Sequence, residues 1–403
     1  MNAVEFGNVD ILFPRERGKK GARAVRESLA KLDAGGSREE IAEACGVTVG
    51  VAGASLAVAP GEICVMMGLS GSGKSTLMRA ANGLTAVTRG KVLIGDANGP
   101  IDVGHCGTES LRRLRRERVT MVFQQFALLP WRTVAENVGL GLELRGETVA
   151  TRKRIVTEQL ELVGLSQWAD RDVGELSGGM QQRVGLARAF ATKADILLMD
   201  EPFSALDPLI RDKLQDELLA LQERVRKTIL FVSHDLDEAL RLGDRISIMH
   251  HGRIVQSGTA QDIVLRPAND YVAEFVQHMN PLTVLTGAMV MRRCERMDRT
   301  GGAVCLDGAR RYQLTLDSRL APVELKLNGQ PHPLLIVGED AACDQDERAV
   351  VVAPASLSLQ ALILLCRKTG HPVLLAEAGQ VLGVCGETEI IGALATRAFG
   401  ANG

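Results

Sequence analysis

The sequence predicts an α/β fold in which helices cover a parallel sheet, followed by a small α+β domain. Residues 51–280 alternate apolar, strand-like runs with amphipathic helical patterns, which is typical of such a sheet. A glycine-rich segment, Gly68–Ser75, stands between one such run and a helical pattern. After residue 280 the chain changes to short strand-like runs with several glycines. We therefore expect one domain over residues 1–280 and a second over residues 281–403.

The first domain begins with an interrupted β-structure. Residues 1–13 alternate as an opening strand does. Residues 14–50 are interpreted as an inserted helical element, because Ser37 and Glu40 form a capping-box pattern before a short helix that Gly46 would close. The strands expected in the parallel sheet are Ile63–Met67, Thr120–Phe123, Ile196–Met199 and Thr228–Ser233.

The composition excludes several classes of protein. Charged residues make up 24% of the chain, and the net charge of −2 gives no overall attraction to nucleic acid or anionic lipid. The eight cysteines lack metal-site spacing and are interpreted as reduced cytosolic thiols. Ala349–Cys366 is uncharged over nearly the length of a membrane span, but Pro354 and Ser358 interrupt it. A buried strand at Val350–Val352 and a short helix at Leu357–Cys366 are expected there instead.

Gly68–Ser75 (GLSGSGKS) matches the GxxxxGK[ST] pattern of a phosphate-binding loop, between a strand and a helix as that loop requires. Its glycines let backbone N–H groups turn toward phosphate oxygens. Lys74 brings a positive charge to the β- and γ-phosphates, and the Ser75 hydroxyl is a ligand for Mg²⁺. The residues expected to hold ATP here are Gly68, Ser70, Gly71, Ser72, Gly73, Lys74, Ser75 and Thr76.

A later apolar run ends in two carboxylates, Asp200 and Glu201. On its own, a strand that ends in two acids is weak grounds for a site. Because this strand follows a phosphate loop in the chain, however, the pattern predicts that Asp200 lies in the Mg²⁺ shell and that Glu201 polarises the attacking water.

The segment Leu176–Arg183 (LSGGMQQR) predicts a helix whose N-terminus is an anion site, with Ser177, Gly178 and Gly179 at its opening. This segment resembles the signature motif of ATP-binding cassette (ABC) proteins, and the resemblance extends over about residues 51–280. It implies a P-loop NTPase cassette with a helical subdomain beside the parallel sheet. It also implies that this motif meets the γ-phosphate bound by a second copy, so that the working unit is a homodimer.

Further family elements follow in the expected order, and the resemblance implies their roles. Gln124 matches the glutamine that touches Mg²⁺ or water. Asp207 ends a segment that crosses the dimer near the nucleotide, and His234 matches the histidine that contacts the γ-phosphate. The resemblance thus gives a catalytic set of Glu201, His234 and Gln124, and a metal set of Ser75, Gln124 and Asp200.

Three features allow two interpretations each. Phe13 either stacks on the adenine or fills the hydrophobic core. Pro130 and Trp131 belong either to a groove that receives a permease or to a core-packed loop. Leu111–Arg118 (LRRLRRER) lacks interleaved aromatic residues, which favours a solvated helix face over a nucleic-acid site.

Longer matches resemble the ATPase subunits of importers for quaternary amines, which are choline, glycine betaine and proline betaine. They lie at Phe203–Arg211, Ser233–Ala239 and Pro267–Val272, and Phe123–Arg132 is closest to the choline branch. The resemblance implies two copies of the chain at the cytoplasmic face of a bacterial inner membrane, two permease subunits, an external substrate-binding protein and no nucleic acid. The chain is only 3% aromatic, whereas quaternary ammonium cages are aromatic, so cargo selection is expected elsewhere. The alternatives are another cargo, such as a polyamine or amino acid, and a soluble, non-transport ABC ATPase.

In the second domain, Ala355–Thr369 and His371–Ile391 resemble one cystathionine-β-synthase-type (CBS) repeat, with a helix, two strands and a helix. Residues 284–340 fit that pattern poorly. The resemblance implies a regulatory module, and a degenerate dimerisation or structural domain is the alternative.

Overall fold

A computed structural model describes residues 2–96, 99–192, 194–277, 282, 285–300, 302–338 and 348–398. The chain divides into two compact units, Met1–His278 and Met279–Gly403, and each is described by itself. The domain boundary expected at Asn280 and Pro281 lies outside the described residues.

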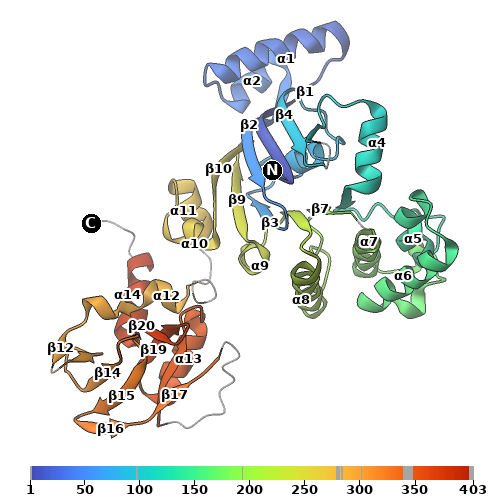
Figure 1. Cartoon of the computed structure of the whole chain (residues 1–403). Helices are drawn as coiled ribbons and strands as arrows, with labels where there is room; N and C mark the ends of the chain where they lie inside the picture. Colours follow the sequence, from blue (N-terminus) through green and yellow to red (C-terminus); the bar gives the residue numbers. More distant parts are fainter. Residues whose placement is uncertain are drawn as a thin grey trace. The chain divides into compact units, whose positions relative to one another are not determined.

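A six-stranded sheet forms the centre of the first unit (Figure 1). Its strands are β3 (Ile63–Met67), β6 (Val119–Val122), β7 (Ile196–Asp200), β8 (Thr228–Val232), β9 (Arg245–His250) and β10 (Arg253–Gly258). They are ordered β10-β9-β3-β8-β7-β6, and all neighbours are parallel except β9 and β10. The four predicted sheet strands are confirmed, with ends that differ by at most one residue. Every residue of β3, β7 and β8 is buried, which is typical of parallel strands with both faces covered.

Helices surround this sheet. They are α3 (Lys74–Ala80), α4 (Thr108–Glu117), α5 (Val134–Leu144), α6 (Val149–Leu162), α7 (Gly178–Ala191), α8 (Pro208–Val225), α9 (Leu236–Leu242), α10 (Ala260–Leu265) and α11 (Asp270–Gln277). Short 3-10 turns occur at Ser166–Trp168 and Val173–Glu175. Helices α5 and α6 pack on α7 and form the predicted helical subdomain (Figure 1). One apolar core joins this group to the sheet.

A second, antiparallel sheet carries the inserted element. Its order is β2 (Val47–Val58), β1 (Val4–Pro14), β4 (Arg89–Ile94) and β5 (Ile101–Asp102). The insertion replaces the turn between β1 and β2, since Phe13 pairs with Thr48 and Pro14 with Val47 at its base. It contains α1 (Gly18–Asp33) and α2 (Arg38–Cys45), which lie together in Figure 1.

The predicted short helix of the insertion is confirmed in α2. The Ser37 side chain accepts from the Glu40 N–H, and the Glu40 side chain accepts from the Ser37 N–H, which completes the capping box. Gly46 closes the helix at φ 63°, a left-handed conformation that glycine adopts without strain. These local signals fix both ends of α2.

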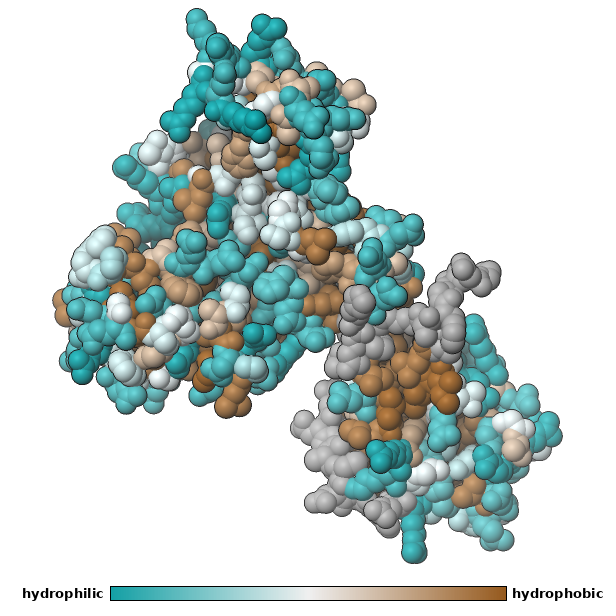
Figure 2. All heavy atoms as spheres, turned by 180° about the vertical axis from the view of Figure 1, so that it is seen from behind, coloured by the Kyte–Doolittle hydropathy of each residue, from teal (hydrophilic) through white to brown (hydrophobic). Residues whose placement is uncertain are grey.

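The second unit has two five-stranded sheets. One is ordered β11 (Arg292–Arg293), β20 (Gln380–Cys385), β19 (Val373–Glu377), β18 (Val350–Pro354), β17 (Leu334–Ile336). The other is ordered β12 (Arg299–Thr300), β13 (Ala303–Cys305), β14 (Tyr312–Leu316), β15 (Pro322–Leu327), β16 (Gln330–His332). Its helices are α12 (Gly287–Val290), α13 (Leu359–Thr369) and α14 (Glu387–Ala398), with a 3-10 turn at Cys294–Arg296. The expected helix, two strands and helix are present as α13, β19, β20 and α14. Figure 2 shows hydrophobic residues gathered on one visible face of this unit.

The uncharged segment Ala349–Cys366 contains β18 and the first part of α13, as predicted. Within the described ranges, none of the helices combines the length and apolar character that a membrane crossing requires. Seven cysteines in the described part of the chain are free thiols, and Cys343 lies outside it.

Candidate nucleotide site

The glycine-rich loop joins β3 to α3 at the carboxyl end of a buried central strand. Gly68, Gly71 and Gly73 have φ values of 139°, 77° and 103°, a region in which glycine is unstrained. Two of them also lie against other backbone. A Cβ on Gly68 would meet the Met249 carbonyl oxygen at 2.1 Å, and one on Gly73 would meet the Gly50 carbonyl oxygen at 2.5 Å. Both conformation and space therefore require glycine at these two positions.

Lys74 lies inside the loop, with only 7% of its surface exposed. Its Nζ donates to the carbonyl oxygens of Gly68 at 2.8 Å and Leu69 at 3.0 Å. Burial lowers the pKa of Lys74 from its ordinary value, while the carboxylates of Glu201 and Asp200 oppose that shift. The loop thus holds a desolvated cation, whose attraction for an anion is stronger than it would be in water.

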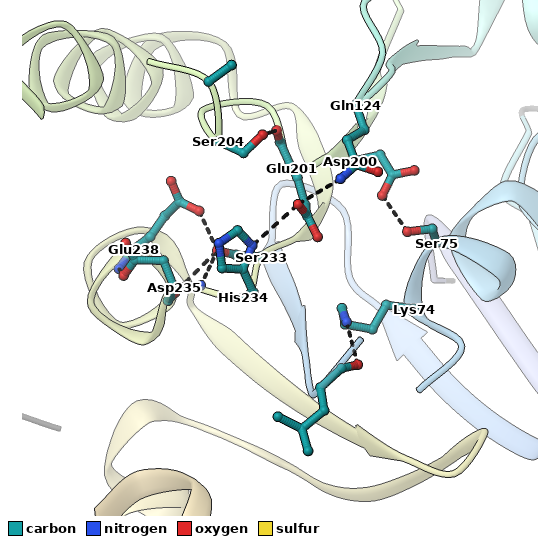
Figure 3. A network of polar contacts seen from close by, with 12 residues as sticks. Lys74, Ser75, Gln124, Asp200, Glu201, Ser204, Ser233, His234, Asp235 and Glu238 are labelled. Carbon is teal, nitrogen blue, oxygen red and sulfur yellow. Dashed lines mark hydrogen bonds and ion pairs between the residues drawn. The ribbon is translucent and has the colours of Figure 1, made fainter. Parts of the chain in front are cut away.

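Asp200 ends β7 and is completely buried. Its carboxylate accepts from the Ser75 hydroxyl at 2.6 Å and from Arg79 Nη2 at 2.8 Å (Figure 3 shows the Ser75 contact). The structure therefore brings the two predicted metal ligands of the loop and the strand into contact. Arg79 was not predicted; its position on α3, one turn after Ser75, is the signal that could have identified it.

Glu201 follows Asp200 and contacts the other two predicted catalytic residues, Gln124 and His234. Its Oε2 accepts from Gln124 Nε2 at 3.0 Å and lies 3.3 Å from His234 Nδ1 (Figure 3). Gln124 follows β6 and His234 lies two residues after β8, so adjacent parallel strands deliver all three side chains to one edge of the sheet. Glu201 has φ 50°, which is uncommon for a residue with a side chain and is often found at functional sites.

Two residues that were not predicted support this cluster. Gln182 is 1% exposed; its Nε2 donates to the Glu201 carbonyl at 3.2 Å, and its Oε1 accepts from the Ala205 N–H at 3.0 Å. It stands in the LSGGMQQR segment, but only the fold shows which way its amide points. Glu238, behind the His234 segment, accepts from the Ser233 hydroxyl and from Gln215 Nε2. Burial raises the pKa of Glu238.

The signature segment lies at the start of α7, as predicted. The Ser177 hydroxyl caps the helix by accepting from the Met180 N–H at 3.4 Å, and Gly178 is exposed. A Cβ on Gly179 would stand 3.2 Å from the Ala205 carbonyl oxygen, so the segment adjoins the one that ends at Asp207. Among the described residues, the hydrogen bonds of Ser177 stay within the first turn of α7. In the described part of the chain, Ser177 thus forms no hydrogen bond with the phosphate loop.

Asp207 has a local role in the described structure. Its Oδ1 accepts from the Ile210 N–H at 3.1 Å and caps α8, with Pro208 at the first helical position. This cap fixes the direction in which α8 leaves the site.

Phe13 lies beside the phosphate-loop helix and is 46% exposed. A Cβ built on Gly50 would stand 2.7 Å from Phe13 Cε2 and 3.3 Å from Thr76 Cγ2, so both side chains border the same point. This exposure does not fit a core position and favours the stacking interpretation. Trp131 is 75% exposed, which likewise rules out a core-packed loop.

The arginine-rich run forms most of α4, and its charges are engaged locally. Four of its arginines donate to neighbouring groups: Arg113 to Asp96, Arg115 to the Asn82 carbonyl, Arg116 to Glu117 and Arg118 to Asp195. Three of these arginines are thus paired with carboxylates, which favours the solvated helix face.

Comparison with known proteins agrees with this geometry. A family model described as "ABC transporter" matches residues 51–204. The glycine betaine transport ATP-binding protein OpuAA of Bacillus subtilis (strain 168) is 48% identical over 299 residues, which are 74% of this chain and 69% of that protein. The glycine betaine/proline betaine transport system ATP-binding protein ProV of Escherichia coli (strain K12) is 50% identical over 262 residues, 65% of this chain and 64% of that protein.

A solved structure supports the fold. The dimeric post-hydrolysis state of the ATP-binding cassette MJ0796 bound to ADP and Pi is 29% identical, with a TM-score of 0.53, and covers 64% of this chain and 98% of that one. The likeness confirms the predicted cassette fold.

Proposed function

Since the chain belongs to the ATP-binding subunits of ABC transporters, we propose that it energises the import of a quaternary amine of the betaine and choline class. Its activity is ATP hydrolysis coupled to transport. The names of OpuAA and ProV support glycine betaine and proline betaine as cargo. The run Phe123–Arg132 is the feature that favours choline within the class.

The arrangement around Glu201 carries the proposal. Gln124 and His234 hold the Glu201 carboxylate beside the Ser75–Asp200 pair, in the place where a γ-phosphate held by the loop would meet water. Glu201 orients and polarises the attacking water, whose oxygen bonds to the γ-phosphorus while the bond to the bridging oxygen of ADP breaks. Lys74 and the loop amides bind the charged oxygens, and His234 contacts the γ-phosphate.

The residues present fit a magnesium ion. Ser75 Oγ and Asp200 Oδ1 are oxygen donors only 2.6 Å apart, and Gln124 is the third proposed ligand. A small number of protein ligands suits Mg²⁺, because this ion commonly takes its other ligands from phosphates and water. When bound, the ion neutralises charge on the phosphates.

The site is proposed to be completed by a second copy. Gly178 is exposed, and the amides at the start of α7 form a helix end suited to bind an anion. The dimeric MJ0796 cassette supports a pair of chains. In the proposed head-to-tail pair, Ser177, Gly178 and Gly179 of one chain meet the nucleotide of the other.

A membrane partner is proposed to dock beside α5 and α6. Exposed Trp131 lines a groove there together with Arg132, Val149 and Lys153, close in sequence to Gln124. A permease helix in this groove would sense the state of the ATP site through Gln124. The chain would then act as a peripheral protein at the cytoplasmic face of a bacterial inner membrane, with an external substrate-binding protein selecting the cargo. The second unit is proposed as a CBS-like regulatory module.

Glu201→Gln tests the hydrolytic role. Removal of a general base typically lowers turnover by about 10²- to 10⁴-fold, so this variant is expected to bind ATP normally and hydrolyse it at that reduced rate. Glu223→Gln, on the exposed side of α8, is the matched control. Unchanged hydrolysis in Glu201→Gln would refute the assignment. Uptake of labelled choline, glycine betaine, spermidine and methionine by cells with and without the gene separates the cargo alternatives.

A further inference from the structure

The inserted element reaches the phosphate loop. Arg38 is the first residue of α2, and its Nη1 donates to the Gly71 carbonyl oxygen at 3.3 Å. The capping box of Ser37 and Glu40 fixes the backbone on both sides of Arg38. A residue outside the nucleotide-binding motifs therefore touches the loop that is proposed to hold the phosphates.

Gly71 borders open space, unlike the other two left-handed glycines of the loop. A Cβ on Gly71 would meet nothing within 4 Å, whereas Gly68 and Gly73 are pressed against other backbone. No neighbouring group would crowd a side chain at Gly71, and Arg38 supplies a hydrogen bond to its carbonyl oxygen. In the described ranges Arg38 forms no ion pair, so its charge is not neutralised by a carboxylate at this rim.

The insertion is firmly attached to the cassette, so this contact is made by a fixed element. Ile41 and Leu32 are buried in a small apolar core shared with β1 and β2. Arg89 joins the end of α1 to the sheet, since it donates to Asp33 and to buried Asp10. A rigid support of this kind can hold a loop in one conformation without a large loss of side-chain entropy.

We propose that Arg38 is a positioning residue of the ATP site. Its guanidinium orients the Gly71 peptide so that the neighbouring N–H groups face the phosphates, and its charge adds to that of Lys74 at the loop. This inference rests on the proposed ATP site. Arg38 makes no described contact with Glu201, so its effect falls on the affinity for a nucleoside triphosphate rather than on the rate of the bound complex.

The test measures ATP affinity and ATPase kinetics of the full-length chain. Arg38→Ala is expected to raise the Kd for a fluorescent ATP analogue and the KM for ATP about fivefold, equivalent to about 1 kcal/mol, with kcat within about twofold. Arg38→Lys keeps the charge but loses the planar donor group, and is expected to show a smaller increase. Arg26→Ala is the matched control, because Arg26 is an exposed cation of the same insertion.

Two results would overturn the inference: an unchanged Kd in Arg38→Ala, or an equal rise in Arg26→Ala, which would indicate a general charge effect. If the unfolding midpoint shows that Arg38→Ala is not folded, the Kd of Arg38→Lys for the ATP analogue is used in its place, and an unchanged Kd in that variant would overturn the inference. Lys74→Ala is measured in parallel. Normal ATP binding by that variant would contradict the ATP site itself, whereas a loss confined to Lys74→Ala would contradict only the role of Arg38.

Discussion

Replacing Arg79 by methionine is expected to destabilise the first unit, because the buried Asp200 carboxylate would lose its cationic partner. The Asp200 carboxylate is 0% exposed, and Arg79 lies 2.8 Å from it as its charged partner. Methionine retains an apolar stem of similar shape, so the change removes the guanidinium with little loss of packing. The substitution therefore leaves a buried carboxylate with only the Ser75 hydroxyl as a side-chain donor.

The magnitude follows from how much of the pair is buried. Removing one partner of a fully buried ion pair costs about 3–5 kcal/mol. Here the Arg79 side chain is 41% exposed, so solvent already screens part of its charge. Its Nε is also buried without a hydrogen-bond partner among the described residues, and methionine removes that unfavourable group. A loss of about 2 kcal/mol in the free energy of unfolding is expected.

Urea denaturation followed by tryptophan fluorescence measures this loss. Both tryptophans, Trp131 and Trp168, lie in the first unit, so the signal reports on that unit alone. In an Asp200→Asn background the same Arg79→Met change is expected to cost less than about 0.5 kcal/mol, because the charge that needed a partner is absent. An equal cost in both backgrounds would refute the reasoning, since it would mean that Arg79 stabilises the unit through packing.

Two further predictions concern a glycine pair and a buried acid. Gly68→Ala is expected to abolish ATP binding, because its Cβ would stand 2.1 Å from the Met249 carbonyl oxygen. In Gly71→Ala the new Cβ meets open space, so the expected penalty is only the conformational free energy of a side-chain residue at φ 77°, about 1 kcal/mol. Equal ATP affinities of the two variants would contradict this. Burial raises the pKa of Glu238, so the folded chain binds the carboxyl proton more tightly than the unfolded chain. The contribution of Glu238 to the free energy of unfolding therefore falls as the pH rises above 4.5, the ordinary pKa of a glutamate. Glu238→Gln is therefore expected to be more stable than the wild type at neutral pH, with an advantage that disappears below pH 4.5; a difference independent of pH in urea titrations would disprove it.

Patterns in the sequence predicted several of the residues that the structure brings together at this edge of the sheet. The loop glycines match a phosphate-loop pattern, and Asp200 and Glu201 gain meaning from following it in the chain, whereas His234 is identified through the resemblance to the family. Arg79 is harder to predict, because its place one turn after Ser75 becomes informative only once Ser75 is expected to lie beside Asp200.

In the fold as well, elements with local sequence signals are predictable and elements without them are not. Helix α2 is marked by its capping box and Gly46, whereas α1 begins after Arg17 without a side-chain cap and so has no clear start in the sequence. The sheet β12–β16 consists of strands no longer than six residues joined by hairpins, which are too short for a periodic pattern to define them. The contact between Arg38 and Gly71 joins an insertion to a motif, and only the folded chain reveals it.

The hydrogen bonds of the site bear on what nucleotide binding can contribute. Lys74 donates to the carbonyl oxygens of Gly68 and Leu69, and the proposed mechanism directs the same ammonium group toward the phosphates. For Lys74, binding therefore exchanges hydrogen bonds to carbonyl oxygens for hydrogen bonds to phosphate, and such an exchange has a small net free energy. Affinity must then come from charge and from additional donors. The helix end at Ser177 of a second copy offers amides that take no part in the exchange, so closing the dimer would add interactions that one chain lacks.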